Sequence, residues 1–234
     1  MRSLIYFALA AGSALSLAAA DGVLLPFKEV TVSSAVSGIL AEVKVKEGDA
    51  VSKEDLLAHL IDRVEAKEAE RFAKVLEQKE FAAQGTQNLF NDKVVSEGEA
   101  IEKRLDRDIA KLQHQVALEQ LERRKIRSPI TGLVVEKKKE TGEAVNENEV
   151  VFRVIDISQV YLQVFVDAQI AIKLKQGQSV PVTFPEYQDL KSPGVIDFID
   201  PRIDGASGLV RIKVLIDNPD RKLIAGMRGS VAFN

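Results

Sequence analysis

Apolar residues recur along the chain with two different periods, and the change of period divides it into parts. In residues 23–62 and 128–156 they alternate with polar residues or form short runs, which is typical of β-strands. In residues 63–127 they recur every three or four positions among Glu, Lys and Ala, which predicts amphipathic helices. From residue 157 to 234, short apolar runs separated by turn residues again predict strands.

The two strand-rich parts that flank the helices contain one motif twice. Val36–Asp62 and Ile130–Asp156 align without a gap at a constant offset of 94 residues, from 36 to 130. Identical residues stand at Gly38/Gly132, Glu42/Glu136, Gly48/Gly142, Ala50/Ala144, Val51/Val145, Ile61/Ile155 and Asp62/Asp156. A unit that cannot bury its apolar face alone usually buries it against its copy. We therefore expect two half-motifs that close one small domain; an unrelated pair of hairpins is the alternative.

Glycines give each half its expected turns. Gly48 and Gly142 lie in tight turns that demand a positive φ, which glycine adopts at no steric cost. Gly38 and Gly132 stand at the start of a strand, where the missing Cβ lets another backbone or a packed side chain come close. These strands are expected at Gly38–Val45 and Gly132–Lys139.

Two helices are expected between the halves. The first covers Arg63 to about Gln84, with an apolar stripe of Ala69, Phe72, Leu76 and Ala83. Residues 84–99 are expected to break it, and Ser96 with Glu99 forms a capping box that starts the second helix near Glu97. Its stripe is Ile101, Leu105, Ile109, Leu112 and Val116, and Ser128-Pro129 ends the segment. We expect the two stripes to hold the helices together as an antiparallel coiled-coil hairpin about 38 Å long.

The last part predicts a small antiparallel β-barrel. Strands are expected at residues 160–166, 179–184, 194–199, 210–216 and 229–233, with a short helical piece at Gln169–Lys175. Asp217-Asn218-Pro219-Asp220 marks a turn between the last two strands. Short strands at this spacing suit a barrel.

The duplicated motif resembles the biotinyl/lipoyl domain, a flattened β-barrel with pseudo-twofold symmetry. In the carrier proteins of that fold, the modifiable lysine stands in the turn where this chain has Arg63 after Asp62. A carrier is therefore the alternative. A lipoyl-like domain split by a helical hairpin resembles the periplasmic adaptor, or membrane fusion (HlyD-like), proteins of tripartite efflux pumps and type I secretion systems. The return at 126–132, Ile-Arg-Ser-Pro-Ile-Thr-Gly, is similar to that family's Ile-Arg-Ala-Pro-x-x-Gly.

The barrel carries a second match to the same family. Asn218-Pro219 precedes Leu-Ile-Ala-Gly226-Met227, which resembles the family's Asn-Pro followed by Leu-x-Pro-Gly-Met, with Ala225 in place of the proline. The resemblance implies these domains: a signal peptide at 1–20, a lipoyl-like domain at 21–62 and 128–156, a hairpin at 63–127 and a barrel at 157–234. Adaptors of RND pumps usually continue into a membrane-proximal domain, whereas this sequence ends at Asn234.

The resemblance also implies a function. Such an adaptor links an inner-membrane exporter of RND or ABC type to a TolC-like outer-membrane channel, and copies of it associate into a ring or funnel. In the family the hairpin tip docks on the channel through an Arg, Leu, Ser signature. Leu89 and Ser96 match the last two positions, whereas Gly85 stands where the arginine is expected. With no membrane-proximal domain, transporter contact is expected to rest on the barrel. An envelope scaffold that grips another protein with its hairpin is a further alternative.

The N-terminal segment predicts export, and the overall charge gives no reason to expect a nucleic-acid partner. Met1-Arg2, an apolar run from Leu4 to Leu17 and Ala18-Ala19-Ala20 predict a signal peptide cleaved after Ala20, and hence a periplasmic protein; an uncleaved anchor is the alternative. The net charge of −3 and the absence of Trp give no reason to expect nucleic acid as a partner.

No catalytic, cofactor or metal site is expected. The chain has no Cys, and its two histidines, His59 and His114, are far apart in sequence with no ligand spacing around them. No Gly-x-Ser-x-Gly or phosphate loop occurs. Lys137-Lys138-Lys139 is a small basic cluster, expected to be an exposed strand edge, with acidic lipid or a neighbouring subunit as the alternative partner.

Overall fold

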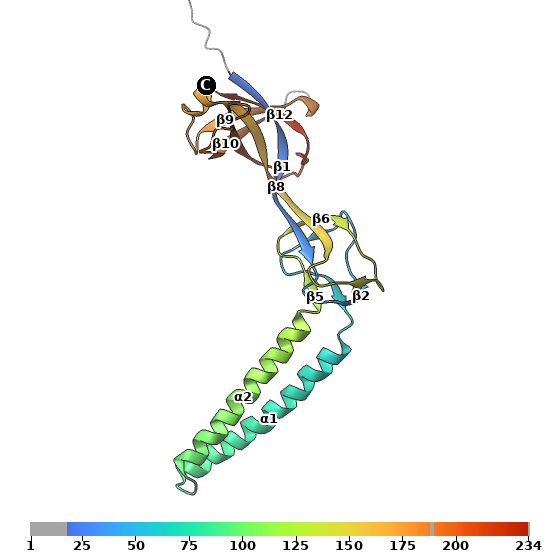
Figure 1. Cartoon of the computed structure of the whole chain (residues 1–234), viewed down its shortest axis with the longest axis vertical. Coiled ribbons are helices and arrows are strands. Elements are labelled where there is room, and N and C mark those ends of the chain that lie inside the picture. The colour runs from blue at the N-terminus through green and yellow to red at the C-terminus, as the bar shows by residue number, and fades with distance from the viewer. Residues whose placement is uncertain (1–17, 188–189, 234) are drawn as a thin grey trace, which may run out of the picture. The chain divides into compact units, whose positions relative to one another are not determined.

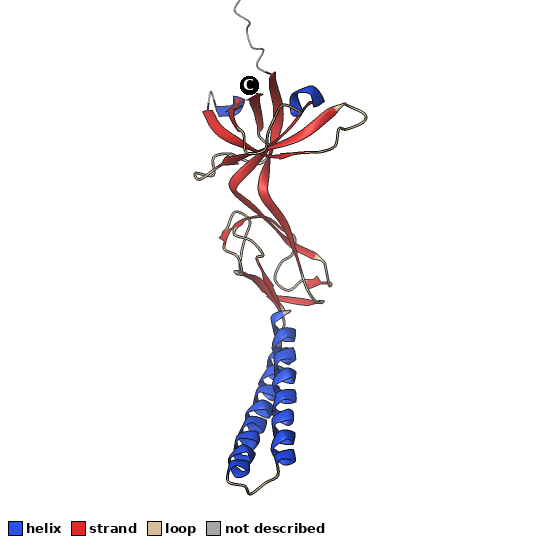
Figure 2. Ribbon diagram, turned by 90° about the vertical axis from the view of Figure 1, so that its left-hand side faces the viewer, coloured by secondary structure: helices blue, strands red, loops and turns tan. Residues whose placement is uncertain are grey.

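A computed structural model describes residues 18–187 and 190–233. The chain divides into two compact units: Lys28–Asp156, and the residues up to Phe27 together with those from Ile157 onward. Strands dominate the second unit, and in the first unit a long helical hairpin is inserted into a strand-rich domain (Figure 2). The predicted fold class, mainly β with a split lipoyl-like domain, a helical hairpin and a small barrel, is confirmed.

The lipoyl-like part of the first unit is built by exchange between its halves. Its strands are β2 (Gly38–Val43), β3 (Ala50–Val51), β4 (Leu56–Leu60), β5 (Lys125–Arg127), β6 (Gly132–Lys137), β7 (Ala144–Val145) and the first part of β8 (Val150–Asp167). β2 pairs with β7, and β3 pairs with β6, so each half supplies a strand to the other. One apolar core lies between them, and it includes Leu40, Leu57, Val134 and Phe152.

Backbone hydrogen bonds repeat this exchange at an offset of 94 residues. The Gly48 N–H donates to the Val134 carbonyl at 2.8 Å, and the Gly142 N–H donates to the Leu40 carbonyl at 2.8 Å. Both glycines have a φ of +91°, as the turn motif predicts. The two half-motifs therefore close one domain with pseudo-twofold symmetry, which confirms the reading of the repeat.

The repeat extends further than sequence identity in the motif suggests. Ser34 and Ser128, also 94 residues apart, are both buried. Each hydroxyl donates to the carbonyl two residues on, that of Val36 or Ile130, at 2.6 Å. Ser34 and Ser128 therefore occupy equivalent positions in the two halves and make the same hydrogen bond.

The insertion is an antiparallel pair of helices, α1 (Arg63–Asn91) and α2 (Glu97–Glu122) (Figure 1). The expected break from Gln84 is wrong, because α1 continues for two more turns through Gly85. One glycine costs a helix only about 1 kcal/mol, and packing of buried Ala83 on α2 compensates. Amide pairs four residues apart, Gln84–Asn88 and Gln87–Asn91, also support these turns.

The stripe expected to face α1 lies on the other side of α2. The buried residues of α2 are Ala100, Ala110 and Ala117. The predicted stripe is between 41% and 62% exposed at all five positions, namely Ile101, Leu105, Ile109, Leu112 and Val116. On α1 the prediction agrees with the structure, because Ala69 and Ala83 are buried and Phe72 and Leu76 half-buried.

Six of the strands that the structure describes close a barrel in the second unit. Their order is β1 (Ala18–Ser33), β12 (Arg228–Phe233), β9 (Ser179–Phe184), β10 (Leu190–Ile199), β11 (Leu209–Asp217) and β8, which pairs with β1. Two short helical turns follow strands of the barrel, α3 (Ala168–Ala171) after β8 and η1 (Pro185–Tyr187) after β9; α3 is shorter than the expected piece at Gln169–Lys175. Alternate residues point inward, as at Leu162, Ile212 and Val231, which are fully buried.

The boundary expected at residue 21 differs from the structure. The residues up to Phe27 belong to the barrel unit, because β1 pairs with β12 from Ala18↔Phe233 to Val23↔Arg228. The last three residues of the predicted signal peptide, Ala18–Ala20, take part in this pairing. The rest of that predicted peptide lies outside the described residues.

Candidate docking site

The tip of the hairpin presents two aliphatic side chains to solvent. The Val94 N–H donates to the Leu89 carbonyl at 2.8 Å, so the loop folds back on the last turn of α1. Lys93, at a φ of +63°, makes this reversal. Leu89 is 44% and Val94 67% exposed. The tip therefore offers an apolar knob of two residues, of which the sequence motif identified only Leu89.

Ser96 fixes the start of α2 from this loop. Its hydroxyl accepts the Glu99 N–H at 3.2 Å, as the capping box predicts. An N-cap of this kind typically contributes about 1 kcal/mol. The side chain remains exposed, so the cap leaves room for a partner to approach.

Gly85 lies one helical turn before Leu89, on the same face of α1. No atom lies within 4 Å of the position that a Cβ would take there. The surface thus has room for the arginine that the family signature would place at this position.

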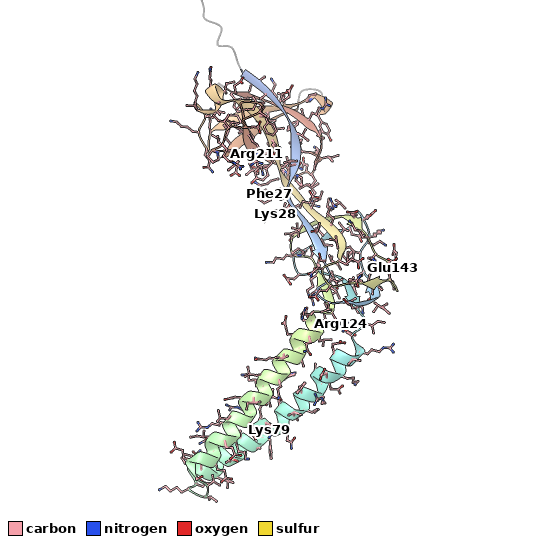
Figure 3. All side chains as sticks on the ribbon, viewed as in Figure 1. Phe27, Lys28, Lys79, Arg124, Glu143 and Arg211 are labelled. Atoms are coloured by element: carbon pink, nitrogen blue, oxygen red, sulfur yellow. The ribbon has the colours of Figure 1, made fainter. Side chains whose placement is uncertain are left out.

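The base of the hairpin is anchored to the lipoyl-like domain by Arg124 (Figure 3). Its guanidinium donates to the Glu65 carboxylate of α1 at 2.5 Å and to the Ser37 carbonyl at 3.1 Å. Arg123 adds a bond to the Ala35 carbonyl at 2.9 Å. Since Arg124 and Glu65 are both mostly buried, this ion pair fixes where the helices leave the domain. Neither Arg124 nor Glu65 belongs to a recognised sequence motif, and in the sequence Arg124 stands out only as part of the charged stretch that precedes the second half-motif.

A second ion pair joins the helices along their length. Lys79 of α1 donates to Asp106 of α2 at 2.8 Å (Figure 3). The hydrogen bond and charge of Lys79 lower the pKa of Asp106. Both side chains are about one third exposed, so the pair sets the register of the helices more than their stability.

The position of a carrier lysine is occupied by the start of α1. Asp62 is the N-cap residue, and the helix begins at Arg63. A carrier needs a tight turn that displays lysine there, and this chain has neither the turn nor the lysine.

The barrel motif ties the loop before β12 to the rest of the barrel. Asn218 is buried; its amide donates to the carbonyls of Ile157 and Leu223 at 2.8 and 2.9 Å, and its oxygen accepts the Leu223 N–H. Pro219 follows it in the exposed turn. Gly226, at a φ of +95°, and Met227 exchange backbone bonds with Leu24 of β1. These hydrogen bonds hold the loop before β12 in place and so shape the barrel.

A shallow groove of about 410 Å³ on the barrel is lined by Phe165, Asp200, Arg202 and Arg211. Asp200 accepts hydrogen bonds from both arginines. The Arg202 bond, with the charge of both arginines, lowers the pKa of Asp200 to about 2. The carboxylate therefore neutralises part of the groove's positive charge.

The remaining candidate groups are the acidic and histidine side chains and the basic cluster Lys137-Lys138-Lys139. Within residues 18–187 and 190–233, no cluster of three His, Cys, Asp or Glu side chains could hold a metal ion. The basic cluster is engaged in ion pairs: Lys137 with Glu140, Lys138 with Glu136 and Lys139 with Glu149. In the same described part of the chain, no helix has the length and apolarity needed to cross a membrane.

Comparisons with known proteins agree with this architecture. The family model described as the CzcB-like, barrel-sandwich hybrid domain matches residues 28–156, and the CusB-like, beta-barrel domain matches residues 159–234. The chain is 27% identical over 209 residues to an uncharacterized protein of Haemophilus influenzae, covering 88% of this chain and 54% of that protein. It is 27% identical over 99 residues to the cobalt-zinc-cadmium resistance protein CzcB of Cupriavidus metallidurans, covering 42% of this chain and 19% of CzcB. The chain thus spans less than two thirds of each relative.

A solved structure shows the same fold. The MacA-MexA chimeric protein, which contains the Pseudomonas aeruginosa MexA α-hairpin domain, superposes with a TM-score of 0.79 at 24% sequence identity, covering 92% of this chain and 77% of the chimera. A lipoyl-like domain split by a helical hairpin and followed by a barrel defines a membrane fusion protein, a class associated with the cell envelope. This chain belongs to the CzcB-like periplasmic adaptor family of efflux pumps.

Proposed function

We propose that this protein is a non-catalytic periplasmic adaptor that couples an RND-type inner-membrane transporter to a TolC-like outer-membrane channel. The observation that carries this proposal is the rigid hairpin, anchored at its base by Arg124 and ending in the exposed pair Leu89 and Val94. Such an element can hold two partners at a fixed separation. At about 1.5 Å per residue, the 29 residues of α1 span about 43 Å.

Two findings favour an RND-type partner over an ABC-type one. Both family models that match this chain take their names from CzcB-like and CusB-like proteins, and the matched relative CzcB is a metal resistance protein. The barrel, which carries the family motif at Asn218, is the part proposed to meet the transporter.

The export route and assembly belong to the same proposal. Residues 1–20 act as the signal for export to the periplasm, and several copies surround the transporter as a ring or funnel. The tip residues Leu89 and Ser96 meet the channel without the arginine of the family signature, so Val94 supplies part of the contact.

The test is transport by cells that lack the gene and are complemented with variants. Replacing both Leu89 and Val94 by Asn is expected to abolish efflux through the inner-membrane transporter that the adaptor serves, while the far-UV circular dichroism of the purified variant stays unchanged. Phe81→Asn is the matched control, since Phe81 is 84% exposed on α1 away from the tip. Normal efflux by the tip variant, or equal loss by the control, would refute the proposed role of the tip.

A further inference from the structure

The groove on the outside of the barrel has a floor made by two neighbouring strands, β8 and β11. Phe165 of β8 lies directly opposite Arg211 of β11 in the antiparallel ladder. The loop between β10 and β11 forms the wall, and it contributes Ile203. Phe165 is 50% and Ile203 57% exposed, so the groove offers water an apolar surface. At about 410 Å³, it lies within the size range of small-molecule sites.

Backbone hydrogen bonds fold the wall of the groove onto itself. The Asp204 N–H donates to the Leu209 carbonyl at 2.9 Å, and the Gly208 N–H donates to the Asp204 carbonyl at 2.8 Å. The Asp204 carboxylate also accepts hydrogen bonds from the amide and the hydroxyl of Ser207, at 2.8 Å each. The wall is therefore built before a ligand arrives, and binding does not have to order it.

Asp200, at the base of the groove, is saturated as a hydrogen-bond acceptor. Its buried carboxylate accepts three hydrogen bonds from Arg202, one from the backbone N–H at 3.1 Å and two from the guanidinium at 3.1 and 3.2 Å. It accepts a fourth from Arg211 at 2.9 Å. A carboxylate has about four acceptor positions, so these four bonds fill them. The acid therefore orients both arginines and leaves no acceptor of its own for a ligand.

The two arginines still have donors to offer. Within the described residues, Asp200 is the only hydrogen-bond acceptor of the Arg211 side chain, and it uses Nη2 alone. The ring of Phe198, 5.7 Å from the guanidinium carbon, holds Arg211 in place from another side (Figure 3). The side chain of Arg202 is 80% exposed, and its Nη1 has no acceptor in this part of the chain. The groove thus presents N–H donors beside an apolar surface.

The charges of the lining limit the ligand to one negative charge. Hydrogen bonds from Ser207 lower the pKa of Asp204, and the pKa of Asp200 is lowered to about 2, so both acids are ionised at neutral pH. Two positive and two negative charges then line the groove. Asp204 would repel a dianion such as phosphate, whereas an uncharged ligand would leave the guanidinium donors without a charged acceptor. A single carboxylate suits the fork of donors that an arginine presents.

We infer that this groove binds small organic carboxylates that carry an apolar body. The carboxylate accepts hydrogen bonds from Arg202 and Arg211, and the body packs on Phe165 and Ile203. The site goes beyond the proposed function and does not depend on it, because it uses none of the residues assigned to the hairpin tip or to the barrel motif. A shallow site and a ligand with few non-hydrogen atoms imply weak binding, with a Kd of about 1 mM.

Ligand-detected NMR on the purified full chain tests the inference, with 3-phenylpropionate as the probe. We expect saturable binding to the wild type. Arg211→Gln and Phe165→Ser should each weaken it about tenfold, because one removes the cation that pairs with the carboxylate and the other the ring beneath the body. Lys213→Gln is the matched control. Lys213 lies two residues from Arg211 in β11 and outside the groove, so its loss should change the Kd less than about twofold.

Two further probes separate the parts of the recognition. 3-Phenylpropionamide keeps the body without the charge, and acetate keeps the head group without the body; each should bind about tenfold more weakly than 3-phenylpropionate. Equal binding of either probe, an equal loss in Lys213→Gln, or no saturation of the wild type at about 10 mM probe would overturn the inference. If circular dichroism shows that Arg211→Gln does not fold, Phe165→Ser and the amide probe decide, because both leave the contact between Arg211 and Asp200 intact.

Discussion

Gly38 and Gly132, the first residues of β2 and β6, occupy equivalent positions in the repeat, but their neighbours differ. A Cβ added to Gly132 would lie 2.1 Å from the Ile155 carbonyl oxygen, which is backbone of β8. A Cβ added to Gly38 would meet the Arg124 guanidinium at 2.9 Å and a methyl group of Leu60 at 3.2 Å. Ile155 pairs with Leu133 of β6 and the chain continues beyond it in β8, whereas the chain after Ile61 turns into α1. This difference predicts unequal effects of the same substitution.

Gly132→Ala is expected to destabilise the lipoyl-like domain by about 3 kcal/mol or more, the upper range for overpacking, because backbone must move. Gly38→Ala is expected to cost about 1 kcal/mol or less. Its nearest neighbours are side-chain ends, the Arg124 guanidinium and a Leu60 methyl group, which need to shift by only a few tenths of an ångström, and the loss of chain entropy in the unfolded state returns about 0.4–1 kcal/mol.

Chemical denaturation followed at 222 nm measures both variants, since the hairpin dominates that signal and belongs to the same unit. The denaturation midpoint of Gly132→Ala should fall well below that of Gly38→Ala, with similar slopes. Equal midpoints, or a lower midpoint for Gly38→Ala, would contradict the argument that the close backbone contact at Gly132 makes it less tolerant of a side chain than Gly38.

Three further predictions concern the turns, the tip and the barrel. Gly48→Ala and Gly142→Ala should lower the free energy of unfolding equally, by about 1 kcal/mol each, because both residues have a φ of +91° and open space around them; unequal losses in denaturation curves would contradict the twofold relation. Gly85→Arg and Gly85→Ala should both raise the melting temperature of the hairpin measured at 222 nm, because each replaces a glycine inside a helix. Only Gly85→Arg should also increase the amount of protein that co-purifies with the outer-membrane channel. Asp200→Asn should lower the free energy of unfolding of the barrel above about pH 4, and the difference from the wild type should shrink as the pH falls towards 2. The reason is that the pKa of Asp200 is lowered to about 2, so protonation of the wild-type carboxylate removes its ion pairs in this range. Denaturation followed by the fluorescence of Tyr161 and Tyr187 in the barrel unit measures the difference, and a difference that is constant with pH would refute the prediction.

The features predicted correctly from sequence are those encoded by local period and by identity between the halves. Constant register over Val36–Asp62 predicted the twofold domain, and the change to a helical period at Arg63 predicted the hairpin. Tertiary pairing decided the rest. The strand order that brings residues 18–27 into the barrel depends on β12, about 200 residues away, and no local pattern records it.

The candidate site was predictable only in part for a similar reason. Leu89 and Ser96 were recognised from a spacing, and the Ser96 cap follows from its neighbours alone. Val94 acquires its exposure from the way the loop folds back on α1, and Arg124 acquires its partners Glu65 and Ser37 only when both ends of the hairpin meet. Such contacts join positions far apart in sequence.

The outward direction of the α2 stripe has a steric origin that hydrophobicity alone does not reveal. α2 carries two seams, one of large aliphatic residues and one in which Ala100, Ala110 and Ala117 recur at heptad positions. α1 already supplies Phe72, Leu76 and Phe90 to the interface between the helices, so small residues opposite them allow close packing without overfilling it. The alanine seam therefore closes the hairpin, and the larger seam stays available. Because Ile109 is 55% exposed and lies outside the contact between α1 and α2, Ile109→Lys should leave the hairpin folded, with a melting temperature at 222 nm close to that of the wild type.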